Sequence, residues 1–170
     1  MGIPLVARIR GAVRELVKRV RRQYFVRIWQ MDIKKRSVIS FSAKLDKTNP
    51  RGVHIGEYTA VTFGAAILTH DHVNNRHRSV HIGNNCFIGA HSIILPGVRI
   101  GDNCVVGAAS VVARDLPAGS LVVGNPARVV EANIKTGHYG VRVVEQVEAP
   151  TPSGEPNSIG ASTSAESLCQ

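Results

Sequence analysis

The sequence predicts an all-β solenoid, in which short parallel strands stack into a coil. The first observation is a period of six in the aliphatic residues, at Ile82, Ile88, Ile94, Ile100, Val106 and Val112. The second is the fourth position after each aliphatic, which is small in every step but the last: Cys86, Ser92, Val98, Cys104, Ser110 and Leu116. The third is an aromatic content of only 5%. A narrow interior filled by two aliphatic or small side chains per face explains all three observations.

Three steps of six residues close a three-sided coil of 18 residues, and successive coils stack about 4.8 Å apart. Residues 18 positions apart then lie above one another, so Ile82 stacks on Ile100 and Cys86 on Cys104. Asn85 and Asn103 recur at the corners, where a residue that tolerates the left-handed backbone region is needed.

The N-terminal segment differs from the coil in charge. The chain of 170 residues has a net charge of +9, and residues 1–36 hold 11 of the 21 basic residues but only two acids. Apolar residues from Leu5 to Tyr24 follow the three-four spacing of one helix face, which predicts a basic amphipathic helix. Such a helix could cap the coil or lie on an anionic membrane surface. We expect no nucleic-acid partner, because aromatic residues are few and no recognition motif is present.

The remaining boundaries follow from composition. We expect the coil over residues 37–130 and a C-terminal extension that packs on it over residues 131–148. In residues 149–170, 15 of 22 residues are Pro, Ser, Thr, Gly or Ala, which predicts a disordered tail. No apolar run approaches the roughly 18 residues of a membrane span, and arginines interrupt the N-terminus too early for a secretory signal. We therefore expect a cytoplasmic protein.

The cysteines form neither a disulfide framework nor a CxxC metal motif. Cys86 and Cys104 occupy equivalent inward positions one coil apart, close enough for a bridge. In a reducing cytosol we expect both to be buried, unreactive thiols that act as small hydrophobic residues. Cys169 falls in the predicted tail.

The six-residue period is interrupted between Ile67 and Ile82, which are 15 residues apart. The polar segment 69–81 holds four of the seven histidines, and we expect it to leave the coil as a loop. Polar loops on a regular scaffold often carry function. A histidine here could act as a general base, because imidazole titrates near neutral pH; the alternative is that these are solvated loop residues.

Two motifs give the sequence a family resemblance. The tandem [Ile/Val]-Gly-x-x-[small]-x and the closing run Val123-Gly124-Asn125-Pro126-Ala127-Arg128 resemble the hexapeptide-repeat acyltransferases, in the branch of sugar and polysaccharide O-acetyltransferases. This resemblance covers about residues 37–130. It implies a left-handed parallel β-helix, a homotrimer with active sites between subunits, and acetyl-coenzyme A as co-substrate. The implied activity is acetyl transfer to a hydroxyl of a sugar in cell-surface polysaccharide biosynthesis.

The resemblance also assigns residues. Leu68-Thr69-His70 matches the family's catalytic stretch, which makes His70 the expected general base, with His72 as the second candidate. The backbone at Ala90 and Ala108 is expected to hold the pantetheine arm of the coenzyme. Basic side chains at the family's phosphate-binding positions correspond to Arg114 and Arg128, and arginine suits phosphate because its planar fork offers paired donors. Asp71 receives no role, and no counterpart of the family's acceptor-binding asparagine is evident.

Other functions remain open from the sequence. His72 and His77 have a spacing that γ-class carbonic anhydrases use to bind zinc, although here the intervening residues indicate a loop. A noncatalytic β-helix scaffold is a second alternative. Transfer to an amino sugar or to serine instead of a sugar hydroxyl is a third. We expect no metal.

Overall fold

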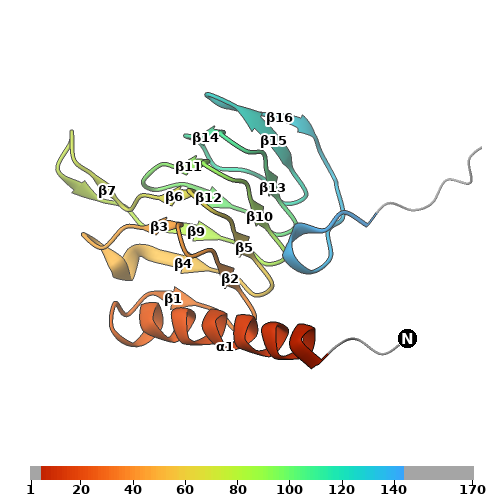
Figure 1. Ribbon diagram of the computed structural model, residues 1–170. Helices are drawn as coiled ribbons and strands as arrows, with labels where there is room; N and C mark the ends of the chain where they lie inside the picture. Colours follow the sequence, from red (N-terminus) through yellow and green to blue (C-terminus); the bar gives the residue numbers. More distant parts are fainter. Residues whose placement is uncertain (1–4, 144–170) are drawn as a thin grey trace, which may run out of the picture.

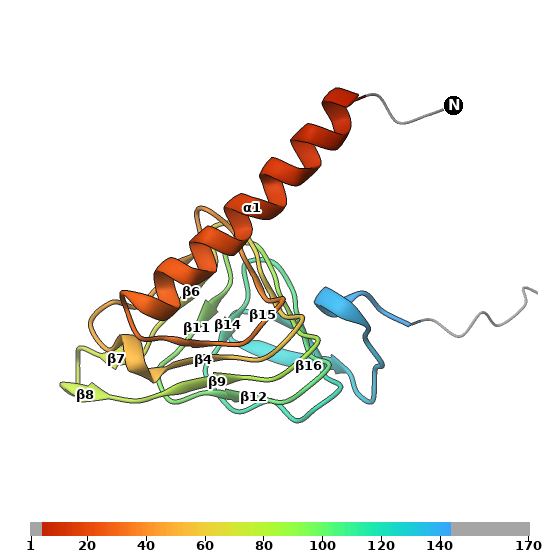
Figure 2. The ribbon, with the colours of Figure 1, turned by 90° about the horizontal axis from the view of Figure 1, so that it is seen from below.

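The computed structural model describes residues 5–143, with side chains described for residues 10, 11 and 13–143. Short strands follow one another around a three-sided coil, which appears triangular when seen along its axis (Figure 2). One long helix, α1 (Leu5–Arg27), crosses the N-terminal end of the coil (Figure 1). The predicted solenoid with an N-terminal helix is confirmed, and the arrangement fits the left-handed β-helix that the family resemblance implies.

Three stacked sheets form the sides of the coil, and their strands pair in parallel except for β15 with β16. The first sheet contains β1 (Asp32–Ile33), β4 (Val53–Ile55), β9 (Val80–Ile82) and β12 (Arg99–Ile100). The second contains β2 (Val38–Ile39), β5 (Ala60–Val61), β10 (Phe87–Ile88), β13 (Val105–Val106), β15 (Leu121–Gly124) and β16 (Ala127–Glu131). The third contains β3 (Lys44–Leu45), β6 (Ala66–Ile67), β11 (Ile93–Ile94) and β14 (Val111–Val112).

The interior of the coil holds the residues that the six-residue period selects. All six aliphatic residues of the repeat are buried, and so are the six residues at the second inward position. Among the buried polar side chains, the Ser92 hydroxyl donates to the Gly89 carbonyl at 2.7 Å, which satisfies it inside the coil. Ser92 therefore fills its inward position without leaving its own donor unpaired.

The length of the coil varies along the axis. Ile82 pairs with Ile100 and Ile88 with Val106, so the predicted step of 18 residues holds here. Elsewhere the step is different. Ile33 pairs with Ile55, 22 positions later; Ile55 pairs with Ile82, 27 positions later; and Val106 pairs with Val122, 16 positions later. A uniform 18-residue coil is therefore wrong for the whole chain, because corner segments of different lengths, some shorter and some longer, join strands that still pair in register.

Corner geometry agrees with the sequence. Asn85, His91 and Asn103 have φ values of 54°, 56° and 58°, in the left-handed region. The coils also approach closely at the glycines that follow the strands. A Cβ atom built on Gly89 would lie 2.5 Å from the Val106 carbonyl oxygen and 2.6 Å from the carbonyl carbon of Gly107. Only glycine fits at this contact between neighbouring coils.

The predicted interruption of the coil is an antiparallel hairpin of β7 (His70–Asp71) and β8 (Arg76–His77), which projects from one corner (Figure 1). His70 pairs with His77 and Asp71 with Arg76. The Asp71 carboxylate accepts hydrogen bonds from Asn74, at 3.1 Å from its backbone N–H and 2.7 Å from its side-chain amide. These bonds hold the pKa of Asp71 below its ordinary value.

Helix α1 contacts the coil through its C-terminal half. The Phe25 side chain is buried in the core, and the Arg21 and Arg22 guanidinium groups donate to the Phe41 and Ile33 carbonyls at 2.7 and 3.1 Å. Further apolar side chains are described on the turns that precede this contact. Four of them are exposed: Val13, Leu16, Val17 and Val20. The helix thus covers the end of the coil and leaves these four apolar side chains uncovered.

The C-terminal part of the described chain returns to the coil. After β16, Ile134 is buried and the Thr136 hydroxyl donates to the Asn85 carbonyl at 2.7 Å. A short 3₁₀ helix, η2 (His138–Gly140), follows, and a second, η1 (Pro50–Gly52), precedes β4. The predicted tail at 149–170, with Cys169, lies outside the described residues.

Cys86 and Cys104 are both buried and free. Their thiols donate to backbone carbonyls, at 3.2 Å for Cys86 to Gly101 and 3.1 Å for Cys104 to Pro117. The contact with Cys104 and the burial of the side chain raise the pKa of the Cys86 thiol. Cys86 therefore acts as a small core residue, as predicted.

Candidate active site

His70 lies where the chain leaves the third sheet and enters the hairpin. Its side chain is half-buried, and the preceding Thr69 is buried. The Thr69 hydroxyl donates to the Asn49 carbonyl at 2.8 Å, while the Thr69 carbonyl accepts from the Arg78 N–H at 2.9 Å. The residue next to His70 is therefore fixed by two segments of the chain at once.

Asp46 holds the backbone of His70 directly. One carboxylate oxygen, Oδ2, accepts from the N–H groups of Thr69 and His70, both at 2.9 Å. The other, Oδ1, accepts from the Thr48 N–H at 2.8 Å. Burial raises the pKa of the Asp46 carboxyl, but the N–H donors of Thr69, Thr48 and His70 outweigh it and lower the pKa overall. Asp46 is thus an ionised acceptor that positions the candidate base.

Three histidine rings gather at the base of the hairpin. The His70 ring centroid lies 5.0 Å from that of His77 and 5.6 Å from that of His72, both edge to face. His72 and His77 are exposed, whereas His70 is half-buried. Within residues 5–143, no group of three or more His, Cys, Asp or Glu side chains is arranged to hold a metal ion.

Ala90 and Ala108 lie at equivalent positions on neighbouring coils. The Ala109 N–H donates to the Ala90 carbonyl at 2.8 Å, which links the two corners. Among the described residues, the N–H groups of Ala90 and Ala108 donate to no acceptor. Two backbone donors on stacked turns are thus available to an extended ligand that carries carbonyl groups, as the resemblance predicts for the pantetheine arm.

Arg114 follows β14 at the same corner of the coil where His70 follows β6, because β6, β11 and β14 stack in register. Ala90 and Ala108 precede β11 and β14, so they lie at the opposite ends of these strands. Four of the predicted site residues therefore border one face. Arg128 lies on β16, in the second sheet, and both arginines are exposed.

Asp46 and Asn49 are the site residues that sequence reasoning missed. The Asn49 side-chain amide donates to the Thr69 carbonyl at 3.3 Å. The sequence holds a signal for them, because residues 46–50 lengthen the coil between Leu45 and Val53, as the polar segment 69–81 does later. Sequence alone could not show that these two interruptions meet at one corner.

Comparison with known proteins agrees with this architecture. Residues 79–114 match the family described as the hexapeptide repeat of succinyl-transferase. Protein CapG of Staphylococcus aureus is 43% identical over 62 residues, which cover 30% of this chain and 36% of CapG. The predicted resemblance to hexapeptide-repeat acyltransferases is confirmed.

Two solved structures resemble the chain in fold and sequence. The first is a hexapeptide-repeat containing acetyltransferase of Vibrio cholerae, VCA0836, with a TM-score of 0.53 and 27% identity over 58% of this chain and 60% of that chain. The second is a variant of AntD, an N-acyltransferase from Bacillus cereus in complex with dTDP and coenzyme A, with a TM-score of 0.52 and 26% identity over 56% and 60%. The chain thus spans about a third of the curated relative and 60% of each of these structures.

Proposed function

We propose that the protein transfers an acetyl group from acetyl-coenzyme A to a hydroxyl of a sugar, in the biosynthesis of a cell-surface polysaccharide. The observation that carries this proposal is the position of His70. Asp46 holds its backbone where the strands of the third sheet end, and the Ala90 and Ala108 N–H groups lie free where these strands begin. The relatives support it, because VCA0836 is described as an acetyltransferase and AntD as an N-acyltransferase found with coenzyme A.

In this mechanism His70 accepts the proton of the attacking hydroxyl, the oxygen forms an ester bond to the acetyl carbon, and the carbon–sulfur bond breaks. The same proton then passes from His70 to the leaving thiolate, so no covalent enzyme intermediate is needed. Ala90 and Ala108 donate backbone hydrogen bonds to the pantetheine arm, and Arg114 and Arg128 bind the coenzyme phosphates. The arrangement is completed between subunits of a homotrimer.

Replacing His70 tests the chemical role. We expect His70→Ala to lower kcat by about 100-fold or more, since a positioned base contributes about 10²–10⁴, while the affinity for acetyl-coenzyme A stays the same. His54→Ala is the control, because His54 is a half-buried histidine on a different sheet that pairs with Asp32 at 3.3 Å. Turnover of His70→Ala close to that of His54→Ala would rule out His70 as the base. Loss of turnover in His72→Ala alone would move the role to His72.

We also propose that helix α1 holds the enzyme against an anionic membrane on the cytoplasmic side, near a lipid-linked acceptor. The side chains of Leu16 and Val20 are 61% and 60% exposed on a helix rich in arginine. Apolar side chains that enter the interface while arginines meet anionic headgroups would hold the helix there. No helix among the described residues has the length and apolar character needed to span a bilayer.

Vesicle binding tests this location. The full chain should sediment with vesicles that contain phosphatidylglycerol and not with pure phosphatidylcholine. Leu16→Gln combined with Val20→Gln should release it, whereas Val73→Gln, which alters an exposed valine at the hairpin tip, should have no effect. Equal sedimentation of all three proteins would refute the membrane role of the helix.

A further inference from the structure

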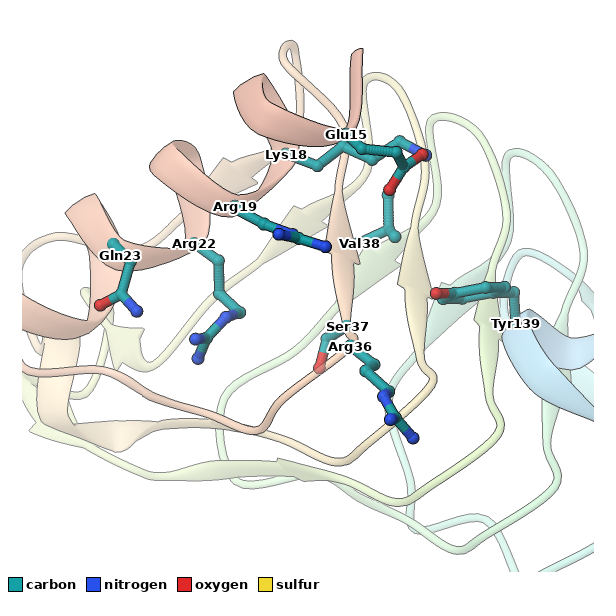
Figure 3. A pocket seen from close by; sticks show the side chains of 9 residues that line it. All are labelled: Glu15, Lys18, Arg19, Arg22, Gln23, Arg36, Ser37, Val38 and Tyr139. Atoms are coloured by element: carbon teal, nitrogen blue, oxygen red, sulfur yellow. The ribbon is translucent and has the colours of Figure 1, made fainter. Parts of the chain in front are cut away.

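A cavity of about 290 Å³ lies between helix α1 and the first corner of the coil, and no hairpin residue lines it (Figure 3). Its charged and phenolic lining comprises Glu15, Lys18, Arg19, Arg22, Arg36 and Tyr139. These residues come from three segments that are far apart in the sequence. None of them has a role in the proposed acetyl transfer.

Helix geometry brings the basic residues together. Lys18 and Arg22 are four positions apart on one face of α1, and Arg19 lies beside them. In Figure 3 the guanidinium groups of Arg19 and Arg22 extend from the helix toward the loop that carries Arg36. The Arg22 guanidinium is anchored by donation to the Ile33 carbonyl at 3.1 Å, which leaves most of its N–H donors uncommitted.

The wall opposite the helix is joined to the coil by contacts around Tyr58. The Tyr139 N–H donates to the Tyr58 carbonyl at 2.7 Å, and the neighbouring His138 ring stacks on the Tyr58 ring with centroids 3.7 Å apart. Arg36 lies over the same Tyr58 ring, 5.3 Å from its centroid, and donates to its hydroxyl. The Tyr139 backbone is therefore fixed at the edge of the cavity, and its hydroxyl is directed toward the helix (Figure 3).

The charges of the lining do not balance. The lining holds four cationic side chains and one carboxylate, that of Glu15, and this carboxylate is paired with Lys18 at 2.7 Å. Arg19 makes no hydrogen bond or ion pair within the described residues. Like charges gathered in one hollow repel one another, and an anion that enters the cavity relieves this repulsion.

We propose that this cavity binds a phosphoryl group, as a phosphate or diphosphate ester. Each guanidinium group can donate two parallel hydrogen bonds to a phosphate. The phosphate oxygens point in several directions and so can accept from several arginines, whereas the two oxygens of a carboxylate lie in one plane. The Tyr139 hydroxyl adds a neutral donor. The excess of three positive charges suits a diphosphate better than a monoanion. The volume is at the lower limit of sites for small organic ligands, roughly 300 Å³, so it admits a phosphorylated head and little more.

The phosphoryl group could belong to a soluble ester or to a lipid headgroup, since the exposed apolar face of α1 lies beside the cavity. Titration calorimetry with pyrophosphate, using the full chain at low ionic strength, tests the shared chemistry. We expect saturable binding that Arg19→Gln weakens about tenfold, the usual effect of losing one charge-assisted hydrogen bond. Arg14→Gln removes the same charge from an exposed position on the helix that does not line the cavity, and should change the affinity by less than about twofold.

A second arm identifies the source. If binding to vesicles that contain phosphatidic acid is weakened by Arg19→Gln and not by Arg14→Gln, and pyrophosphate displaces the protein, the site takes a lipid headgroup. If only pyrophosphate binding depends on Arg19, the site takes a soluble ester. Absence of pyrophosphate binding, or equal losses in the two variants, would overturn the proposal. None of these outcomes depends on acetyl transfer, so the proposed function and this site fail independently.

Discussion

The substitution Asp46→Asn tests how the candidate base is positioned. The carboxylate accepts three N–H groups, two at Oδ2 and one at Oδ1. An asparagine side chain has the same shape but only one acceptor atom, because its other atom is an NH₂ donor. In either orientation of the amide, at least one backbone N–H meets another donor, and the remaining bonds lose their charge assistance.

The expected cost follows from these contacts. A hydrogen bond to a charged acceptor contributes about 1.5–3 kcal/mol, and because Asp46 is only half-buried we expect the whole substitution to cost about 2 kcal/mol. For a chain of this size, that corresponds to a Tm lower by about 4–8 °C. The pKa of Asp46 is lowered in the folded protein, so its contribution to stability is present above the unfolded pKa and is lost as the pH falls through the folded pKa.

Circular dichroism on heating and steady-state kinetics measure the two consequences. Because the lost bonds fix the His70 backbone, kcat should fall by about tenfold or more while KM for acetyl-coenzyme A changes little. Asp71→Asn is the matched control, since that carboxylate bonds only within its own turn; its Tm and kcat should stay close to wild type. If Asp46→Asn has wild-type stability and wild-type kcat, the positioning role of Asp46 is wrong.

Three further predictions rest on other parts of the molecule. Gly89→Ala should destabilise the coil by about 1–3 kcal/mol in urea unfolding, because the new methyl group meets backbone of the next coil. Gly11→Ala is the control, since a Cβ at this helix position has nothing within 4 Å, and it should stabilise the protein by about 0.5–1 kcal/mol. The reverse order would contradict the close approach of the coils. Burial, with the neighbouring positive charges, lowers the pKa of His81 in the folded protein. The free energy of unfolding should therefore decrease as the pH falls from above 6.5 through the lowered pKa of the folded state, and His81→Gln should show a weaker decrease. Arg114→Ala and Arg128→Ala should each raise KM for acetyl-coenzyme A about tenfold with kcat nearly unchanged, and an unchanged KM in both would remove them from the phosphate site.

Much of the fold could be predicted from the sequence because the coil repeats a local rule. Each step from Ile82 to Val112 places one aliphatic residue inward. The residue four positions later also points inward, and it is small in every step but the last because the interior is narrow. The positive φ values at Asn85 and Asn103 follow from the same repetition. The coil length did not follow, because strands stay in register across steps of 16 to 27 residues, and the six-residue period does not predict the length of a corner segment.

The site was predicted less completely for a physical reason. A motif predicts His70 as the candidate base, but the residue that holds its backbone, Asp46, comes from the preceding coil. Only three-dimensional stacking brings the two together. The helix shows a similar limit. The predicted helix is present, yet the side that contacts the coil carries Arg21 and Arg22, and the apolar residue Leu16 is exposed. Periodicity identifies a face without saying what covers it.

Transfer of a labelled acetyl group tests the central claim most directly. The purified chain would be incubated with acetyl-coenzyme A that carries ¹³C in the acetyl carbonyl, together with a panel of sugars, amino sugars and serine, and followed by NMR. We expect the label to move from the thioester to an ester of a sugar hydroxyl, with one free thiol released per ester formed. A label that stays in the thioester with every acceptor, in the presence of folded protein, would contradict acetyl transfer as the function.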